Sequence, residues 1–461
     1  MRSFWPTAVL VGILVSLAGY LYVVELPQER TKTLAEAVEK KLLAIEEREV
    51  TGLTVRTGTT DVVLAQADAT AWKVTAPIKT DADPREVSSL LRALVLGKVS
   101  RVIEERATAL EAFGLEKPAA VITLHAGART ESLTIGDSGP LSNTLYAMRA
   151  SDKKVLLTDL APKDVLNKTL QTFRRKDIVR FDQNRLVRVR LVTSKSEILL
   201  ERAGEPPKAK WAIKFPLETR ADQIEVRSLL LKLDDFKARG FIDPGPEHEA
   251  LRKQLTEPAV RMTLEETGGL EKTLRLFQLD PVSGEAYAVG PADGPIYRIT
   301  PDAIHDFSKE LFALLDKRLL GTDREEIGFL KVKTRDEEYT LINQTGMWVL
   351  EEKPTESLDQ QKINLFVSRV VDLPAELRVI KGGVPLAPYG LHAPTAEFTA
   401  LGKDGKERGR MSLGAKAGGL VYAMGQGLSG IYQARADILT QIPAKSELMA
   451  GPAKNTGSPP Q

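Results

Sequence analysis

Ser138 is the residue whose sequence surroundings most suggest covalent catalysis, because it stands in the short stretch GDSGP at residues 136–140. A serine nucleophile needs a histidine base that a carboxylate orients. The nearest histidine, His125, lies on the preceding predicted strand, and no catalytic motif surrounds it. Later parts of the chain carry turn-forming residues at the equivalent place between two strands. We therefore expect a hairpin turn here and not a protease-like site.

Metal and phosphate chemistry have equally little support in the sequence. The four histidines are scattered along the chain: His125, His248, His305 and His392. The densest acidic cluster, DADPRE at residues 81–86, is explained by capping of the helix that follows. No phosphate-binding glycine loop is present, and nothing marks a catalytic pair among the 62 acidic residues. We predict no catalytic, metal-binding or cofactor-binding residue, no cofactor and no enzymatic activity.

The composition is that of a globular, multidomain protein. The 461 residues are 43% hydrophobic and 27% charged, which suits roughly three domains of about 150 residues each. The net charge is only +2, from 64 basic and 62 acidic side chains, so we expect no nucleic-acid partner. The absence of cysteine excludes disulfides, thiolate metal sites and lipid attachment to an N-terminal cysteine.

An apolar stretch at the N-terminus predicts a transmembrane anchor over residues 1–26, with the sequence TAVLVGILVSLAGYLYVV at its centre. Arg2 precedes the span, so the positive-inside rule places the N-terminus in the cytoplasm and the rest of the chain outside. A cleaved signal peptide remains the alternative. Residues 27–49 predict a juxtamembrane helix, with Leu34, Val38, Leu42 and Ile45 on one stripe. That helix would extend the anchor outward or dock on the first domain.

The elements that follow occur three times, with a period of about 138 residues. Each copy has a strand with a tryptophan, then a proline, then a helix that begins after a capping aspartate, then short alternating strands with a tyrosine. The repeated residues are Trp72, Trp211 and Trp348, Asp83, Asp222 and Asp359, and Tyr146, Tyr287 and Tyr422. We interpret them as structural anchors: each aspartate caps a helix, and each tryptophan packs in a core, with an exposed ligand platform as the alternative for the tryptophans.

These copies predict an α+β fold, in which a transmembrane helix is followed by three tandem homologous domains with mainly antiparallel sheets. The expected boundaries are 50–183, 184–322 and 323–449, and the Pro- and Gly-rich tail 450–461 is expected to be disordered. Each helix should bury an i, i+3, i+4, i+7 stripe against its sheet.

The N-terminal anchor, the block WKVTAPIKTDADPREVSSLLRAL and the loops FGLEKP and YGLHAP together resemble domain-of-unknown-function family 4340. Its members are often linked to gliding-type ABC transporter systems as membrane-anchored accessory proteins. The resemblance implies a single-pass protein of the inner membrane with the bulk of the chain in the periplasm. It implies an accessory or scaffold protein of an ABC-type export or gliding-type complex, with other membrane or periplasmic proteins as partners. The alternative is a periplasmic module that binds cell-wall glycan or polysaccharide.

Overall fold

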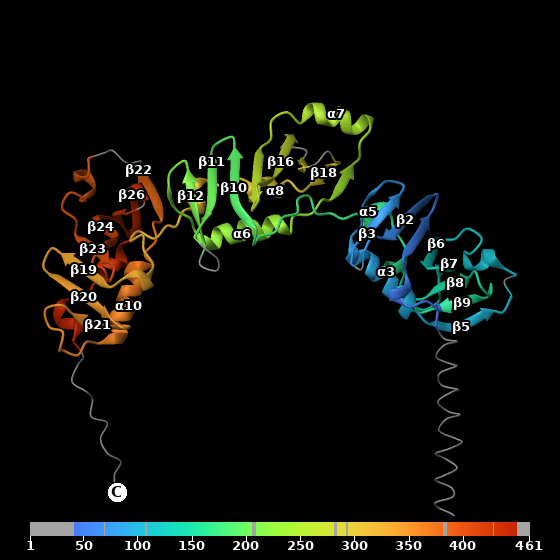
Figure 1. Cartoon of the computed structure of the whole chain (residues 1–461), viewed down its shortest axis with the longest axis horizontal. Helices are drawn as coiled ribbons and strands as arrows, with labels where there is room; N and C mark the ends of the chain where they lie inside the picture. The colour runs from blue at the N-terminus through green and yellow to red at the C-terminus, as the bar shows by residue number, and fades with distance from the viewer. Residues whose placement is uncertain are drawn as a thin grey trace, which may run out of the picture. The chain divides into compact units, whose positions relative to one another are not determined.

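The computed structural model of the chain forms two compact units, Met1–Lys176 and Asp177–Gln461 (Figure 1). The predicted anchor, residues 27–40 of the juxtamembrane segment and the tail 450–461 lie outside the described residues. No helix within the described part of the chain is long and apolar enough to cross a membrane. The structure describes residues 41–68, 70–106, 108–204, 209–280, 284–291, 294–380, 385–426 and 428–449.

The first unit contains one antiparallel sheet of nine strands. The strands are β1 (Gly52–Thr57), β2 (Thr60–Gln66), β3 (Trp72–Ala76), β4 (Thr80–Asp81), β5 (Val99–Glu104), β6 (Ala120–Ala126), β7 (Arg129–Ser138), β8 (Leu145–Arg149) and β9 (Val155–Thr158). The helices are α3 (Pro84–Leu96), α4 (Pro162–Val165) and α5 (Leu170–Phe173), with 3-10 turns η2 (Glu47–Glu49) and η3 (Leu110–Phe113).

The second unit contains two further antiparallel sheets, and the nine strands of the first of these make the middle domain. They are β10 (Leu186–Thr193), β11 (Glu197–Ala203), β12 (Lys210–Phe215), β13 (Thr219–Arg220), β14 (Gly240–Ile242), β15 (Val260–Glu266), β16 (Leu270–Asp280), β17 (Glu285–Val289) and β18 (Ile296–Ile299). The helices are α6 (Gln223–Asp234), α7 (Pro246–Gln254), α8 (Asp302–Phe307) and α9 (Leu311–Leu314).

The third domain has eight strands in one sheet. They are β19 (Phe329–Thr334), β20 (Glu338–Gln344), β21 (Met347–Leu350), β22 (Leu377–Ile380), β23 (Ala396–Leu401), β24 (Glu407–Ala417), β25 (Leu420–Gly425) and β26 (Leu428–Arg435). Its helix is α10 (Gln360–Val371), with 3-10 turns η4 (Arg324–Glu326), η5 (Ala387–Tyr389), η6 (Ala436–Thr440) and η7 (Lys445–Leu448).

The strand order confirms the prediction of three α+β domains with antiparallel sheets. It runs β4-β3-β2-β1-β6-β7-β8-β9-β5 in the first domain and β13-β12-β11-β10-β15-β16-β17-β18-β14 in the middle one. The third domain keeps this order, β21-β20-β19-β23-β24-β25-β26-β22, without a counterpart of β4 or β13. Each strand of the first half pairs with its sequence neighbour, as short hairpins require.

One helix packs on each sheet through the apolar stripe that the sequence predicts (Figure 1). The stripe residues are all buried: Val87, Leu90, Leu91 and Leu94 in α3, Val226, Leu229, Leu230 and Leu233 in α6, and Ile363, Phe366, Val367 and Val370 in α10. Each set belongs to a separate apolar cluster that also contains inward side chains of the strands. Every domain therefore has its own core.

The end of each domain is hydrogen-bonded to the start of its main helix. The backbone N–H of Asp83 donates to the carbonyl of Phe173 at 2.7 Å. The same bond joins Asp222 to Leu314 at 2.8 Å and Asp359 to Leu448 at 2.9 Å. We call residues 170–175, 311–316 and 445–449 the closing segments, because each returns the chain to the N-terminus of the helix.

The start of each domain lies earlier than the sequence predicts. The segments that begin at Lys41, Asp177 and Arg318 form bridges with residues just after α3, α6 and α10. Each continues with two buried apolar residues: Leu42 and Leu43, Ile178 and Val179, and Leu319 and Leu320. We call residues 41–45, 177–181 and 318–322 the leading segments. The predicted domain starts at 50, 184 and 323 leave these leading segments out. The leading segments are too short to show a periodic pattern in the sequence.

Residues 41–49 differ from the predicted juxtamembrane helix. Only Glu47–Glu49 form a short 3-10 turn. Leu42 and Ile45, which the helical spacing places on one stripe, are instead buried in the core of the first domain. Packing against that core, and the hydrogen bond from the N–H of Leu42 to the carbonyl of Gly97, replace helical hydrogen bonds here.

Candidate functional site

Ser138 and His125 lie at opposite ends of a strand pair. His125 pairs with Thr130 in the β6–β7 ladder, whereas Ser138 is exposed and pairs with Leu145 at the far end of β7. About eight residues of β7 separate the two positions, or roughly 27 Å at about 3.4 Å per residue. That distance rules out proton transfer between these two side chains, so Ser138 and His125 do not form a catalytic pair.

The glycine of GDSGP has a packing role. A Cβ at Gly136 would overlap the carbonyl oxygen of Phe113, and a Cβ at Gly414 in the third domain would overlap that of Tyr389. In both domains the strand bulges at this place, which accommodates the close approach of the 3-10 turn.

The repeated tyrosines lie beside this turn in two of the domains. Tyr146 contacts Phe113 and Tyr422 contacts Tyr389, each with ring centroids 5.0 Å apart. In the middle domain Tyr287 is buried in a small separate apolar cluster, and the guanidinium of Arg298 lies 5.9 Å from its ring. All three rings contribute to packing.

The repeated aspartates occupy helix N-cap positions. The Asp83 carboxylate accepts a hydrogen bond from the N–H of Arg85, and the Asp359 carboxylate accepts one from Lys362. The Asp222 carboxylate accepts from both Ile224 and Glu225. These bonds satisfy backbone donors that a helix leaves free.

A glutamine at the first helical position, which the sequence reading did not single out, fixes the tryptophan strand in two domains. The side chain of Gln223 accepts from the N–H of Trp211 at 2.9 Å and donates to its carbonyl at 2.9 Å. Gln360 makes the same two bonds with Trp348, both at 2.8 Å. The first domain has Pro84 at this position.

The three tryptophans differ in their surroundings. Trp348 is 1% exposed and Trp72 is 7% exposed. The indole N–H of Trp348 donates to the Asn364 side chain at 3.2 Å, and Arg324 donates to the same oxygen. Trp211 is only partly buried, so the expected core role applies to it less fully. No described residue accepts a hydrogen bond from its indole N–H.

Trp211 lines a cavity of about 690 Å³ between the middle domain and the chain that leads into the third domain. Its apolar wall comprises Ala203, Trp211, Ala212, Ala221, Ile224 and Pro374. Volumes of about 300–1,000 Å³ with mostly apolar walls are typical of small-molecule sites. We therefore treat this cavity as the candidate functional site.

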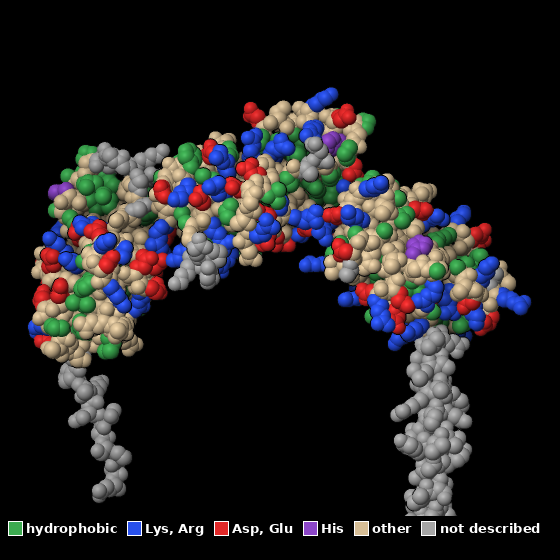
Figure 2. Space-filling model, viewed as in Figure 1, with side chains coloured by type: hydrophobic (Ala, Val, Ile, Leu, Met, Phe, Trp, Pro, Cys, Tyr) green, Lys and Arg blue, Asp and Glu red, His purple; other side chains and the backbone are tan. Residues whose placement is uncertain are grey.

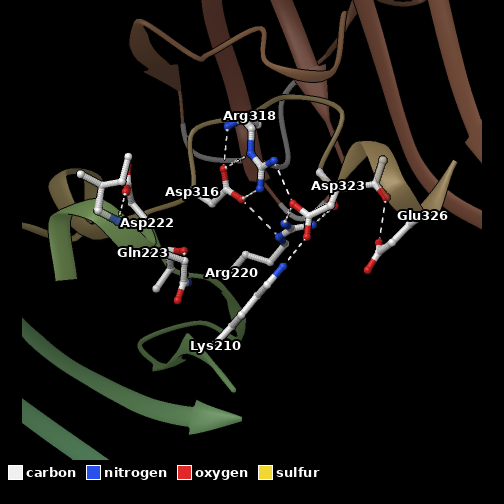
Figure 3. Close-up of polar contacts among 12 residues, drawn as sticks. Lys210, Arg220, Asp222, Gln223, Asp316, Arg318, Asp323 and Glu326 are labelled. Atoms are coloured by element: carbon white, nitrogen blue, oxygen red, sulfur yellow. Dashed lines mark hydrogen bonds and ion pairs between the residues drawn. The ribbon is translucent and has the colours of Figure 1, made fainter. Parts of the chain in front are cut away.

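Charged side chains form one wall of the cavity and converge on Asp323 (Figure 3). Lys210 contacts the Asp323 carboxylate at 2.6 Å, Arg220 at 2.7 Å and Arg318 at 2.9 Å. Asp316 accepts two bonds from Arg318, at 2.9 and 2.6 Å, and lies 3.2 Å from Arg220. We call these five residues the ion network. It joins β13 of the middle domain to the leading segment of the third.

The ion network holds the Asp323 carboxylate ionised. Burial raises the pKa of the Asp323 carboxyl, but the hydrogen bonds and charges of its three cationic partners outweigh burial, so this pKa lies well below its ordinary value. The hydrogen bond to Asp316 raises the pKa of the Arg318 guanidinium. Within the network three cations face two carboxylates, and the cavity as a whole is lined by four cations and four carboxylates.

Within the described residues, no group of three or more histidine, cysteine, aspartate or glutamate side chains could hold a metal ion. Acidic and basic side chains are interspersed on the face that Figure 2 shows, with no large area of one sign.

Two overlapping regions, residues 72–250 and 211–379, match the family described as Domain of unknown function (DUF4340). The chain belongs to the DUF4340 family. Both matches begin at a repeated tryptophan, Trp72 and Trp211, so the DUF4340 pattern extends from one domain into the next. No curated protein and no solved structure gave a match.

Proposed function

We propose that this DUF4340 protein is a non-enzymatic accessory or scaffold subunit of an ABC-type export or gliding-type transporter complex. An N-terminal anchor in the inner membrane would present the three domains in the periplasm. The supporting observation is that the repeated residues have structural roles: the aspartates cap helices, the tyrosines pack against neighbouring side chains, and two of the three tryptophans are buried. Such a chain offers several related binding surfaces on one anchor, which suits an assembly role.

The middle domain carries a surface suited to a protein partner. On the outward side of α6, Ile224 is 79% exposed and Leu231 is 53% exposed. They are separated by two helical turns and so lie on one stripe. The equivalent residues are Arg85 and Arg92 in α3, and Gln361 and Ser368 in α10. The other two helices each expose a leucine elsewhere, Leu96 in α3 and Leu365 in α10, but only α6 exposes two apolar side chains on one stripe. Such a stripe indicates binding to a protein partner.

The test is crosslinking in native membranes, followed by identification of proteins that co-purify with the full-length chain. We expect transporter components with the wild type and their loss from the variant Ile224→Glu/Leu231→Glu. The matched control is Gln361→Glu, at the exposed position of α10 that is equivalent to Ile224, which should leave the partners unchanged. Recovery of no membrane-transport component would contradict the proposed function, and equal loss in both variants would contradict the role of this surface.

A further inference from the structure

We propose that the cavity beside Trp211 binds a saccharide that carries a carboxylate. A sugar ring would pack on Trp211, and its carboxylate would contact Lys210 and Arg220. This proposal goes beyond the scaffold role and does not depend on it.

The tryptophan in this cavity is the one of the three repeats that its own domain leaves partly uncovered. In the third domain Asn364 binds the indole N–H, and Arg324 binds Asn364. In the middle domain the equivalent residues are Arg227 and Gln183, and none of the described side chains accepts a bond from the indole of Trp211. A partly exposed indole supplies a flat apolar face and a free donor, and both suit the C–H face and hydroxyls of a sugar.

The unused N–H donors of two cations in the ion network suit an anionic group on the ligand. Lys210 is 59% exposed and uses one of its three N–H donors, toward Asp323. Arg220 uses three of its five donors, toward Asp316, Asp323 and the carbonyl of Gly321. Both residues line the cavity, and their remaining donors suffice to bind one carboxylate without displacing an existing contact.

The other charged residues of the cavity are already engaged. Glu218 pairs with Lys214, and the Asp222 carboxylate caps α6. The ammonium of Lys317 lies 5.3 Å from the centre of the Phe312 ring. Lys210 and Arg220 line the cavity together with the apolar wall that contains Trp211 and Ile224.

The experiment measures binding to the full-length chain in a detergent without a sugar headgroup. The probes are the disaccharide of N-acetylglucosamine and N-acetylmuramic acid, the neutral disaccharide chitobiose, and an acidic tripeptide, each titrated by calorimetry. We expect the carboxylated disaccharide to bind at least 10-fold more tightly than chitobiose. Higher salt should weaken that preference.

Two variants locate the site. Lys210→Gln should reduce affinity for the carboxylated sugar at least 5-fold and leave chitobiose binding unchanged, whereas Trp211→Ala should weaken both sugars. Lys333→Gln, on an exposed strand position of the third domain, is the control. If Trp211→Ala unfolds the middle domain, Lys210→Gln alone carries the test. No binding at millimolar sugar, equal binding of both sugars, or tighter binding of the acidic tripeptide overturns the proposal.

Discussion

Asp323→Asn removes the charge at the centre of the ion network while it keeps the size of the side chain. Asp323 is only 18% exposed and accepts from three cations. The contact with the exposed Lys210 is worth about 0–1 kcal/mol, and each of the two contacts with the less exposed Arg220 and Arg318 about 1 kcal/mol after discounting for solvent. We therefore expect the variant to lose about 2–3 kcal/mol of local stability where the chain passes from the middle to the third domain.

Hydrogen exchange reports that loss at particular amides. The N–H of Asp316 donates to Arg220, and the N–H of Leu319 donates to Leu373. A cost of about 2–3 kcal/mol corresponds to exchange that is roughly 30- to 160-fold faster at these amides. The control Asp404→Asn breaks an exposed pair with Arg408 and should change exchange at these amides less than about 3-fold. Unchanged exchange at both amides in Asp323→Asn would refute the stabilising role of the network.

The remaining predictions concern pH and the repeated residues. The folded-state pKa of Asp323 is lowered, so the stability that its ionised carboxylate contributes is complete above the unfolded pKa of about 3.9 and is lost as pH falls toward the folded pKa. The difference in exchange rate between wild type and Asp323→Asn should therefore stay constant from about pH 8 to 5 and shrink below about pH 4. Trp348→Ala should cost about 3–5 kcal/mol in chemical denaturation and Trp211→Ala only about 1–3, because Trp211 is partly buried; equal costs would contradict this difference. Gly136→Ala should destabilise the first domain by about 1–3 kcal/mol, whereas Gly419→Ala, where a Cβ would meet no atom within 4 Å, should not shift Tm.

The sequence predicts the features that depend on local periodicity. The buried stripes of α3, α6 and α10 follow from apolar spacing alone, and the positions of Asp83, Asp222 and Asp359 before those stripes indicate their helix starts. The antiparallel sheets follow from short alternating strands joined by tight turns. These signals come from neighbouring residues, so no tertiary contact is needed to recognise them.

The candidate site depends on contacts between distant residues. Arg220 meets Asp316 and Asp323 only because the closing segment returns to β13. Trp211 occupies the same position of the repeat as Trp72 and Trp348, yet it is only partly buried whereas they are buried. The repeat pattern does not show this difference, because burial depends on contacts with residues of other elements. Gln223 and Gln360 recur at one position in two copies, and that repetition is the signal by which the clamp could have been found.

The closing segments carry opposite charges in the first two domains. Arg175 donates its backbone N–H to Asp81 at 3.1 Å, and Asp316 donates to Arg220 at 3.1 Å, so the main-chain pairing is the same while acid and base are exchanged. If the first domain bound the closing segment of the middle domain during synthesis, Asp81 would lie beside Asp316. If the middle domain bound the closing segment of the first, Arg220 would lie beside Arg175. Repulsion between like charges would disfavour either product. Tandem copies of one fold can thus mature on a single polypeptide without exchanging their ends.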